Sequence, residues 1–564
     1  MATSPSPSGV QLLLGPVLRH VGRTTATVWV QTSDPAEVDV LGCRASTFTV
    51  CDMHYALVEI SGLAPGSVTP YQVHLDGKPV WPRPGSPWPD SRIRTRGRGE
   101  PVRVIFGSCR RAKPDGPPVG RAGGNEDNED PDDTDALDLY ADRMADAAPE
   151  DWPDVLLLLG DQVYADDPTP QTRRWLDTRR DTGIPPGYEV TDFSEYVRLY
   201  QDSWSDPGAR WLMSTVHTAM IFDDHDVRDD WNTSAAWRRW ITTQPWWPER
   251  IRGALVSYWV YQHIGNLTPE ERHADPTWRA VQGADGDAWS LLRTMAEAVD
   301  ADPAAIRWSF RWIIDGVRLV VIDTRCGRML AEGHRTMLDD AEFSWVESAI
   351  SQDASRAEHV LVGSSLPWLL APVLHDLQSA NEAACAAGST IGERIRQALD
   401  LEHWAAFRDS FERLATVLRR VATGPDAPAS ISVLSGDVHH SYAARAEVEG
   451  APLYQLVCSP IHHSVPRYAT VVLRIVWFAP LAAVVRSVVR RLGVPDPTLS
   501  WRRISGPSFG NAVATLMLSD GRAEFAIERT GPSGRLESTI PVELADRRPS
   551  ESRGVIGDEG VHRS

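Results

Sequence analysis

Seven short apolar runs, each ending in small or polar residues, constrain the fold of this chain more than any other feature of its sequence. They occupy residues 102–109, 154–161, 219–226, 318–325, 359–365, 431–440 and 453–463. Runs of this length that are rich in leucine and β-branched residues are typical of strands buried on both faces. Helix-forming stretches separate them, so the pattern predicts a layered α/β core.

Side chains that bind metals gather at the ends of these runs. Sites in layered α/β folds form just beyond the carboxyl ends of strands. The residues found there are Cys109, Asp161, Asp224, His225, Asp437 and His439. Asp161 leaves an apolar run directly into a loop, where a carboxylate can bridge two cations; a helix N-cap is the alternative. Oxygen ligands with some nitrogen and sulfur suit a two-metal site that binds a phosphoryl group, so the sequence predicts metal-dependent chemistry.

Length, charge and cysteine content exclude several other classes of protein. The 564 residues predict roughly two to four domains of about 150 residues each. The net charge of −19 argues against non-specific nucleic-acid binding. A phosphorylated substrate stays compatible with it, because metal ions reverse the local field. Six cysteines without a CxxC motif argue against a disulfide scaffold and against structural zinc.

Two segments of the sequence indicate where in the cell the protein is expected. The N-terminus has neither a basic region nor an apolar core, so no export signal is expected and the predicted location is cytoplasmic, with export as the alternative. The longest apolar segment, 469–492, contains four arginines and a proline, whereas a spanning helix needs about 20 mostly apolar residues. Residues 465–493 contain five arginines and no acid. This segment either contacts an anionic membrane surface or forms a lid helix or a subunit contact.

Residues 1–98 are predicted to form a separate β-sandwich domain, because short strands alternate there with turn residues. The stretch LAPGSVTPYQVHL resembles the corner of a fibronectin type III domain, in which a tyrosine follows a Leu-x-Pro-Gly turn; Tyr71 would be that tyrosine. We expect this domain to pack against or position the rest of the chain. Recognition of a wall or membrane polymer is the alternative.

The composition of the rest of the chain divides it into a catalytic domain and a tail. Residues 99–545 are predicted to form the catalytic domain, with 465–498 as an apolar and basic insertion and 499–545 as C-terminal strands, including a hairpin at Asp520-Gly521. The tail 546–564 is polar and predicted to be disordered.

Two internal segments have distinctive compositions. The tryptophan-rich interval 167–312 is interpreted as a helical insertion packed by aromatic side chains, with sugar stacking as the alternative. The acidic stretch 120–138 is interpreted as a solvated loop, because its spacing does not match an EF-hand.

The motifs at the strand ends resemble those of PhoD-like (alkaline phosphatase D-like) phosphatases, a branch of the calcineurin-type metallophosphoesterases. The resemblance rests on FGSCR at 106–110, LLGDQVYADD at 158–167, FDDHDVRDDWN at 222–232, SFRWIIDGVRLVVIDTR at 309–325 and LSGDVHHSYAA at 434–444. It implies a layered αββα sandwich, preceded by a fibronectin III-like β-sandwich domain. The implied activity is hydrolysis of phosphomonoesters or phosphodiesters by a metal-bound hydroxide at a dinuclear site.

The resemblance also implies a role for each motif residue. Asp161 would bridge two metals, and the other ligands would be Cys109, Tyr164, Asp224, Asp437 and His439. A thiolate and a phenolate favour iron at one position, and carboxylates favour a hard cation at the other, so we expect Fe3+ plus Ca2+, with Mg2+, Mn2+ or Zn2+ as alternatives. His225 would be the catalytic histidine and protonate the leaving oxygen. From its place between two aspartates alone, His225 could instead be a metal ligand, and Asp226 is expected to hold its imidazole.

One feature departs from the pattern that the resemblance implies. Another histidine is expected between the third and last motifs, but the strand there ends in GSSLPW and offers only Ser364 and Ser365. Water would then complete the second metal, or its coordination would be weaker.

Other residues are assigned to the surroundings of the site. Arg228, Arg238 and His462 are expected to contact substrate phosphate, and Asp323 and Arg325 to form an internal pair that supports the site. Two other functions remain open: a degenerate metallophosphatase that binds a wall or membrane polymer, and a lipid or polymer phosphodiesterase.

Overall fold

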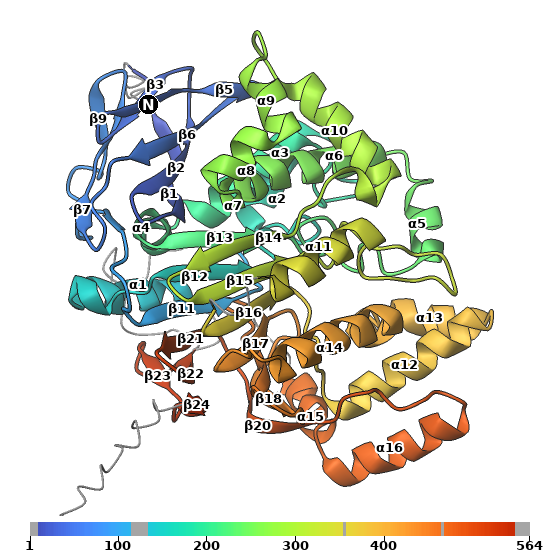
Figure 1. Ribbon diagram of the computed structural model, residues 1–564. Helices are drawn as coiled ribbons and strands as arrows, with labels where there is room; N and C mark the ends of the chain where they lie inside the picture. The colour runs from blue at the N-terminus through green and yellow to red at the C-terminus, as the bar shows by residue number, and fades with distance from the viewer. Residues whose placement is uncertain (1–8, 114–133, 353–356, 464–466, 547–564) are drawn as a thin grey trace, which may run out of the picture.

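The structure is a computed structural model that describes residues 9–113, 134–352, 357–463 and 467–546. An N-terminal β-rich domain is followed by a larger α/β domain, as the sequence predicts (Figure 1). Most of the acidic stretch 120–138 and nearly all of the tail lie outside the described residues. Within the described residues, no helix has the length and apolar character needed to cross a membrane.

The N-terminal domain is a sandwich of antiparallel strands. One sheet has the order β1 (Leu12–Val21), β2 (Thr25–Thr32), β6 (Met53–Ser61), β5 (Phe48–Val50). The facing sheet has the order β4 (Cys43–Ser46), β3 (Glu37–Val40), β8 (Val73–Leu75), β9 (Lys78–Trp81), and β7 (Val68–Pro70) pairs with β10 (Arg92–Arg94). Alternate residues such as Val28, Val30, Val38 and Val40 point into the core between the sheets.

The α/β domain contains two seven-stranded sheets, and all seven predicted strands are present in them. The first sheet has the order β13 (His217–Ile221), β12 (Val155–Leu159), β11 (Val102–Gly107), β21 (Ala512–Ser519), β22 (Arg522–Thr530), β23 (Leu536–Ser538), with β24 (Val542–Asp546) also paired to β22. The second has the order β14 (Phe310–Ile314), β15 (Val317–Ile322), β16 (His359–Ser364), β17 (Ser430–Ser435), β19 (Leu453–Val457), β18 (Ser441–Ala446), β20 (Trp501–Ser508).

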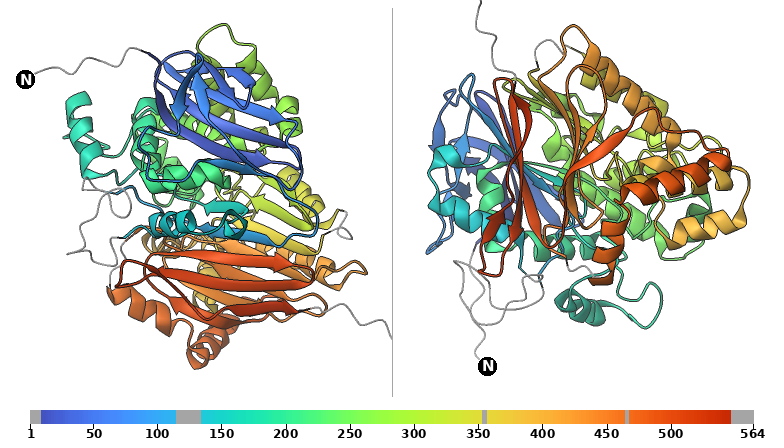
Figure 2. Two further views of the ribbon diagram at one scale, coloured as in Figure 1. Left: turned by 90° about the vertical axis from the view of Figure 1, so that its left-hand side faces the viewer. Right: turned by 90° about the horizontal axis from the view of Figure 1, so that it is seen from below.

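The two sheets pack face to face, as the right-hand view of Figure 2 shows. Strand β15 illustrates why its run is apolar throughout: Leu319 and Val321 belong to the core that the first sheet shares, whereas Val320 and Ile322 belong to the core beneath the helices. Gly363 of β16 leaves so little space that an added Cβ would lie 3.3 Å from Leu159 Cδ2 of the first sheet.

The C-terminal strands complete both sheets. β21 and β22 form the predicted hairpin around Asp520-Gly521, and β21 runs antiparallel to β11. β20 runs antiparallel to β18 in the second sheet. The end of the chain therefore ties together the two halves of the catalytic core.

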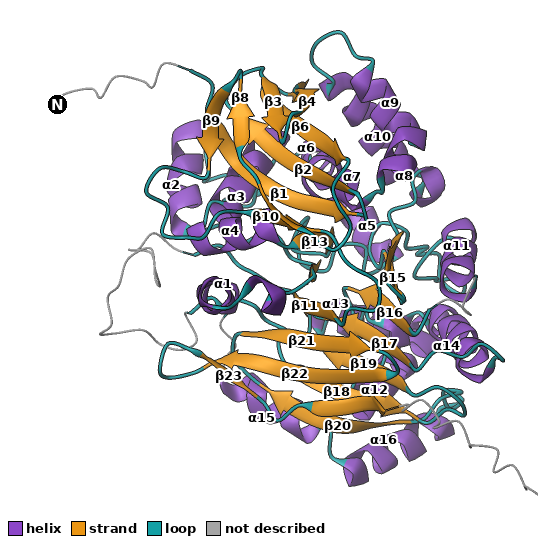
Figure 3. Ribbon diagram, turned by 60° about the vertical axis from the view of Figure 1, so that its left-hand side comes forward, coloured by secondary structure: helices purple, strands orange, loops and turns teal. Residues whose placement is uncertain are grey.

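Helices cover the outer faces of the sheets. Those of the tryptophan-rich interval are α2 (Pro170–Arg179), α3 (Phe193–Trp204), α4 (Pro207–Thr215), α5 (Ala235–Ile241), α6 (Trp247–Ser257), α7 (Ile264–Asn266), α8 (Pro269–Ala274), α9 (Pro276–Gln282) and α10 (Trp289–Ala301), with a π-helical stretch at Tyr258–His263. The others are α1 (Ala136–Asp146), α11 (Asp340–Ser351), α12 (Pro372–Ala386), α13 (Thr390–Ala398), α14 (Arg408–Thr423), α15 (Arg467–Ile475) and α16 (Ala479–Arg491). In Figure 3, α11 and α14 flank the second sheet. α14 buries Phe411, Leu414, Leu418 and Val421, which lie on one helical face.

The two domains share a core, so the N-terminal domain is not an independent module. The Trp29 indole donates to the carbonyl of Val260 at 3.1 Å, and its ring packs 5.4 Å from that of Tyr261. Tyr71 donates to the carbonyl of Ser214 at the end of α4, 2.5 Å away. It therefore ties the sandwich to the α/β domain instead of closing a corner within the sandwich.

Candidate metal centre

Loops from both sheets meet at one end of the α/β domain. The parallel strands β11, β12 and β13 end just before Cys109, Asp161 and Asp224, and β17 ends just before Asp437. Backbone contacts hold the first two loops side by side, because Cys109 N–H donates to the carbonyl of Gly160 at 3.3 Å. Carboxyl ends of parallel strands share one edge of a sheet, which is why residues so distant in sequence converge here.

Four carboxylates form the centre of the site. One carboxylate oxygen from each of Asp161, Asp223, Asp224 and Asp437 lies within 4.8 Å of all the others. Asp161 Oδ1 and Asp223 Oδ2 are buried and, among the described residues, have no hydrogen-bond partner. Asp223 was not predicted as part of the site. Buried acceptors without partners are costly, so this arrangement fits cations that the carboxylates would ligate.

The backbone is strained at four of the predicted ligands. Cys109, Asp161, Asp437 and His439 have φ angles of 56°, 52°, 64° and 51°, in the left-handed region that non-glycine residues rarely adopt. Such conformations persist only when the surrounding structure imposes them, and they concentrate at functional sites. Gly160 has a φ of 106°, and a Cβ there would lie 2.7 Å from that of Asp223. The loop after β12 therefore requires glycine at this position.

Cys109, Tyr164 and His439 lie around the carboxylates. Cys109 Sγ is 3.7 Å from the carbonyl oxygen of Asp437 and 3.2 Å from Ser459 Oγ. The Tyr164 hydroxyl is buried and has no hydrogen-bond partner among the described residues. The His463 ring packs against the rings of both Tyr164 and His439, with centroid distances of 5.5 Å and 4.7 Å.

Without cations, the protonation states of these groups reflect burial. Burial, with the negative charge of Asp437, raises the pKa of the Cys109 thiol to about 12. Burial also raises the pKa of Tyr164 and Asp161 well above their usual values. Burial and the neighbouring His463 lower the pKa of His439 to about 3, so its imidazole is neutral and able to ligate a metal. A bound cation reverses the logic for the thiol and the phenol.

A buried arginine partly compensates the acids. The Arg325 guanidinium contacts Asp223 and Glu402 and lies 3.2 Å from Asp224 Oδ1. Arg328 also pairs with Glu402, at 3.2 Å. When all five carboxylates are ionised, as ligation of cations requires, they face two guanidinium groups and leave about three negative charges uncompensated. This excess fits two cations.

Arg325 differs from its expected role. It was predicted to pair with Asp323, but the carboxylate of Asp323 instead accepts the backbone N–H groups of Arg325, Cys326 and Gly327. Asp323 thus shapes the turn after β15, and that turn directs the Arg325 guanidinium to the acids of the site.

His225 lies beside the carboxylates and is held by Asp166. Its Nδ1 is 3.0 Å from Asp166 Oδ2, and its ring lies 4.6 Å from that of Tyr164. Burial alone would lower the pKa of His225, but the charge of Asp166 and this hydrogen bond outweigh burial and raise it well above the ordinary value. A nitrogen of His225 also lies within 4.8 Å of oxygens of Asp161 and Asp224.

The expectation that Asp226 holds His225 is wrong. Asp226 Oδ1 accepts the backbone N–H groups of Gln162 and Val163, at 3.1 and 3.2 Å, and Oδ2 accepts that of Asp223. It joins the loops after β12 and β13 and points away from the imidazole that follows Asp224. Asp166 takes its place because the loop after β12 returns alongside the loop after β13.

His403 lies beside Asp437 and is a residue of the site that sequence reasoning missed. Its Nε2 is 3.0 Å from Asp437 Oδ2, and its Nδ1 is 3.0 Å from Gln378 Nε2. The Gln378 amide oxygen accepts the backbone N–H of His403, so its nitrogen faces the ring and Nε2 donates to Asp437. The signal for His403 was the expectation of a histidine between the third and last motifs. That histidine was expected at the end of a strand, whereas His403 follows α13.

The two serines considered for that position are engaged elsewhere. Ser364 Oγ donates to the carbonyl of Leu366 at 2.6 Å and accepts from the Trp404 indole. Ser365 Oγ lies 2.5 Å from Thr324 Oγ1. Both hydroxyls therefore support the loop and do not face the carboxylates.

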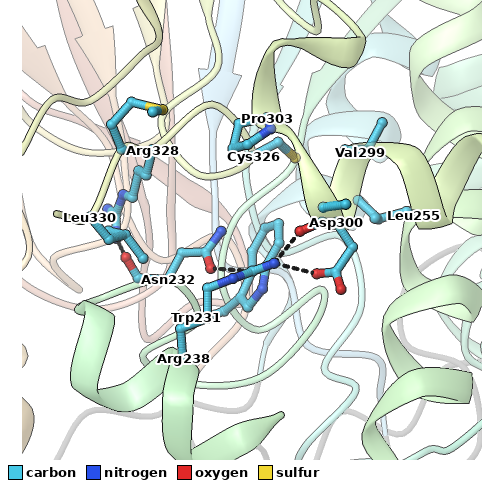
Figure 4. Close-up of a pocket in the computed structure, with 12 residues that line it drawn as sticks. Trp231, Asn232, Arg238, Leu255, Val299, Asp300, Pro303, Cys326, Arg328 and Leu330 are labelled. Atoms are coloured by element: carbon cyan, nitrogen blue, oxygen red, sulfur yellow. Dashed lines mark hydrogen bonds and ion pairs between the residues drawn. The ribbon is translucent and has the colours of Figure 1, made fainter.

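The residues expected to bind phosphate have protein partners. Arg228 pairs with Glu189 at 3.0 Å. Arg238 contacts Asp300 and Asn232 in a cavity of about 180 Å3, which Figure 4 shows. None of the four clustered carboxylates lines this cavity, so it is separate from the metal centre. His462 Nδ1 donates to the carbonyl of Arg111 at 2.6 Å, whereas the adjacent His463 stacks on His439.

Comparison with known proteins assigns this chain to a family. The sequence profile of PhoD-like phosphatases matches residues 138–480, and that of a domain of unknown function, DUF7800, matches residues 9–93. Curated proteins gave no match. A solved structure of PhoD is similar over 97% of this chain and 95% of that chain, with 12% identity and a TM-score of 0.56. A purple acid phosphatase from yellow lupin (Lupinus luteus) seeds is similar over 94% and 74%, with 12% identity and a TM-score of 0.46.

The similarity to PhoD includes both domains, so a β-rich domain that precedes a layered α/β domain is the fold of both proteins. The phosphatase profile spans more than half of this chain and includes Asp161, Asp224 and Asp437. The chain therefore belongs to the PhoD-like phosphatase family.

Proposed function

We propose that this protein hydrolyses phosphomonoesters or phosphodiesters at the four-carboxylate cluster, where two cations bind. The observation that carries the proposal is the convergence of Asp161, Asp223, Asp224 and Asp437, with buried acceptors and excess negative charge, beside His225. Family membership supports a phosphorylated substrate. The presence of every predicted carboxylate ligand in one cluster argues against a degenerate site.

The donors differ in kind across the site. Cys109 and Tyr164 would hold a cation that accepts a thiolate and a phenolate, for which Fe3+ is suited, and Asp161 would be a further ligand. Asp223, Asp224 and Asp437 would hold a second cation, for which oxygen-rich ligands suit Ca2+. Bound there, the cations would supply positive charge to the phosphoryl oxygens and lower the pKa of a nucleophilic water.

The chain's own residues supply positioning and proton transfer. His225, kept protonated by Asp166, would donate its Nε2 proton to the oxygen of the leaving group, a step typically worth 10²–10⁴-fold. The Arg325 guanidinium fixes the orientations of the Asp223 and Asp224 carboxylates through ion pairs. His403 holds Asp437 in the same way through one hydrogen bond.

The direct test combines elemental analysis with an activity screen. We expect the purified protein to bind about two cations, and expect it to lose hydrolysis of a panel of phosphomonoesters and phosphodiesters after chelation and regain it after metal is restored. Asp161→Asn should lower metal content and activity together. A fully metal-loaded protein that hydrolyses none of the panel would contradict the proposal.

His225 needs a separate test, because it is close enough to the carboxylates to be a ligand itself. His225→Ala should lower kcat by about 10²–10⁴-fold while metal content stays unchanged. If metal is lost instead, the assignment of His225 as proton donor is wrong.

A further inference from the structure

Helices α15 and α16 expose an unusual density of large apolar side chains. Seven of the twenty exposed large apolar residues in the described part of the chain lie between residues 471 and 492, and each is 47–69% exposed. They are Val471, Val472, Ile475, Phe478, Val484, Val488 and Leu492. We call this surface the apolar ridge. Clustered exposed apolar side chains of this kind mark interaction sites more often than scattered ones do.

The opposite face of the same helices is firmly packed, so the ridge has a fixed outward orientation. Trp477, between the two helices, places its ring 4.9 Å from that of Tyr442 on β18. Val476 packs with Val373 of α12. Arg486 pairs with Asp376 of α12 at 2.6 Å. Figures 1 and 3 show α15 and α16 along the lower side of the molecule, far from the N-terminal domain.

The charge of this segment is opposite to that of the whole protein. Residues 465–493 contain five arginines and no acid, in a chain with a net charge of −19. Arg486 and Arg490 pair with Asp496, the first acid after the segment. Arg474 and Arg491 are exposed and make no ion pair with any residue that the structure describes, although the Arg474 guanidinium lies 5.3 Å from the centroid of the Phe509 ring. The ridge is therefore bordered by uncompensated positive charge.

An anionic bilayer fits this surface better than a second copy of the chain. A two-fold contact would place the ridge against itself and bring arginines against arginines, which is unfavourable. A bilayer that contains anionic lipids offers an apolar boundary for the valines and leucine, and phosphates for the arginines. We propose that the apolar ridge is a docking surface for an anionic lipid bilayer, on which the protein lies without crossing it.

Co-sedimentation of the full-length protein with vesicles tests this proposal. We expect the protein to sediment with phosphatidylcholine–phosphatidylglycerol vesicles, weakly with phosphatidylcholine alone, and less as salt rises. A variant with Arg474→Gln and Arg491→Gln should bind anionic vesicles about 25-fold more weakly, at about fivefold per arginine. A variant with Val484→Ser, Val488→Ser and Leu492→Ser should lose at least about tenfold.

A matched control separates this surface from general stickiness. Ile184→Ser, Ile313→Ser and Ile540→Ser, combined in one protein, remove side chains that are 60%, 62% and 88% exposed outside the ridge. This protein should bind vesicles as the unchanged protein does. Circular dichroism and thermal unfolding check that each variant is folded.

Three results would overturn the proposal. The unchanged protein would fail to bind phosphatidylglycerol vesicles, or the ridge variants would bind as well as it does. Alternatively, light scattering would show the lipid-free protein to be a dimer that the ridge serines convert to a monomer, which would make the ridge a self-association surface. The proposal does not depend on phosphoester hydrolysis, because binding is measured without substrate.

Discussion

At the scale of single residues, the pairing of His225 with Asp166 sets the charge on the proposed proton donor. The carboxylate raises the pKa of His225 well above its ordinary value, so the imidazole carries a proton at neutral pH. Asparagine at position 166 keeps an acceptor for Nδ1 but removes the charge. It therefore isolates the electrostatic contribution of Asp166 from its role in orienting the ring.

We expect Asp166→Asn to move the alkaline limb of the pH–activity profile to lower pH. A proton donor is active only below its pKa, and loss of the carboxylate lowers that pKa, so activity falls earlier as pH rises. Metal content should not change. Asp167→Asn is the control, because Asp167 pairs with Arg111 and Arg173 instead of with His225. An unchanged profile in Asp166→Asn would contradict this role.

Arg325 is the second residue whose environment gives a quantitative prediction. Its side chain is fully buried and contacts three carboxylates. Replacing it with methionine leaves buried acids without a partner, so Arg325→Met should lower the free energy of unfolding by about 3–5 kcal/mol, measured by urea unfolding of the metal-free protein. Arg44→Met removes an exposed ion pair with Glu37 and should cost less than about 1 kcal/mol.

Added cations provide a further check on Arg325. If its role is to offset the acids, saturating metal should restore part of the stability that Arg325→Met loses, because cations bind the native cluster and not the unfolded chain. Equal unfolding midpoints for the methionine variant and the unchanged protein would contradict the prediction.

At the scale of elements, the loop after β12 is a crowded turn of the candidate metal centre. Gly160 has a positive φ and also lacks space for a side chain, because a Cβ would lie 2.7 Å from Asp223 Cβ. Gly286 has a similar φ, 100°, but nothing lies within 4 Å of an added Cβ. The two positions therefore share backbone strain and differ only in crowding.

Gly160→Ala should displace Asp223 and reduce both metal content and activity. Gly286→Ala should cost about 1 kcal/mol of stability from strain alone and leave the metal content unchanged. Elemental analysis and urea unfolding of both variants make the comparison. Full metal occupancy in Gly160→Ala would show that the loop adjusts without moving Asp223.

At the scale of the whole molecule, we expect the two domains to unfold together, because their contacts are buried. Arg19 of β1 inserts its guanidinium into the α/β domain, where it donates to the carbonyl of Gln262 at 2.6 Å and to Asn266 Oδ1 at 2.8 Å. Burial, together with the nearby Arg272, lowers the pKa of Arg19 to about 9. These acceptors lose their partners if the side chain is removed.

Calorimetry should therefore show one unfolding transition for both domains. Arg19→Ala should lower stability by about 3 kcal/mol, from the cavity and the unpaired acceptors, and should keep a single transition. Arg23→Ala, at an exposed position in the turn after β1, should have little effect. Two separate transitions in the unchanged protein would contradict the shared core.

The sequence by itself determined the seven strands of the layered core, the hairpin at Asp520-Gly521 and the presence of carboxylates, a cysteine and histidines after the strand ends. Apolar runs and turn residues are local signals, and the rule that sites form at the carboxyl ends of strands turns them into a predicted site. The carboxylates Asp161, Asp224 and Asp437 gathered as expected.

Only the tertiary structure decided which groups support those ligands. His403 reaches Asp437 across 34 residues, Asp166 reaches His225 across 59, and Arg325 reaches Asp223 across 102. Such pairs depend on how loops from two sheets are brought together, and no local pattern encodes that arrangement. The wrong expectation for Asp226 has the same origin. Asp226 is adjacent to His225 in sequence, but the loop geometry turns its carboxylate toward the backbone N–H groups of the loop after β12.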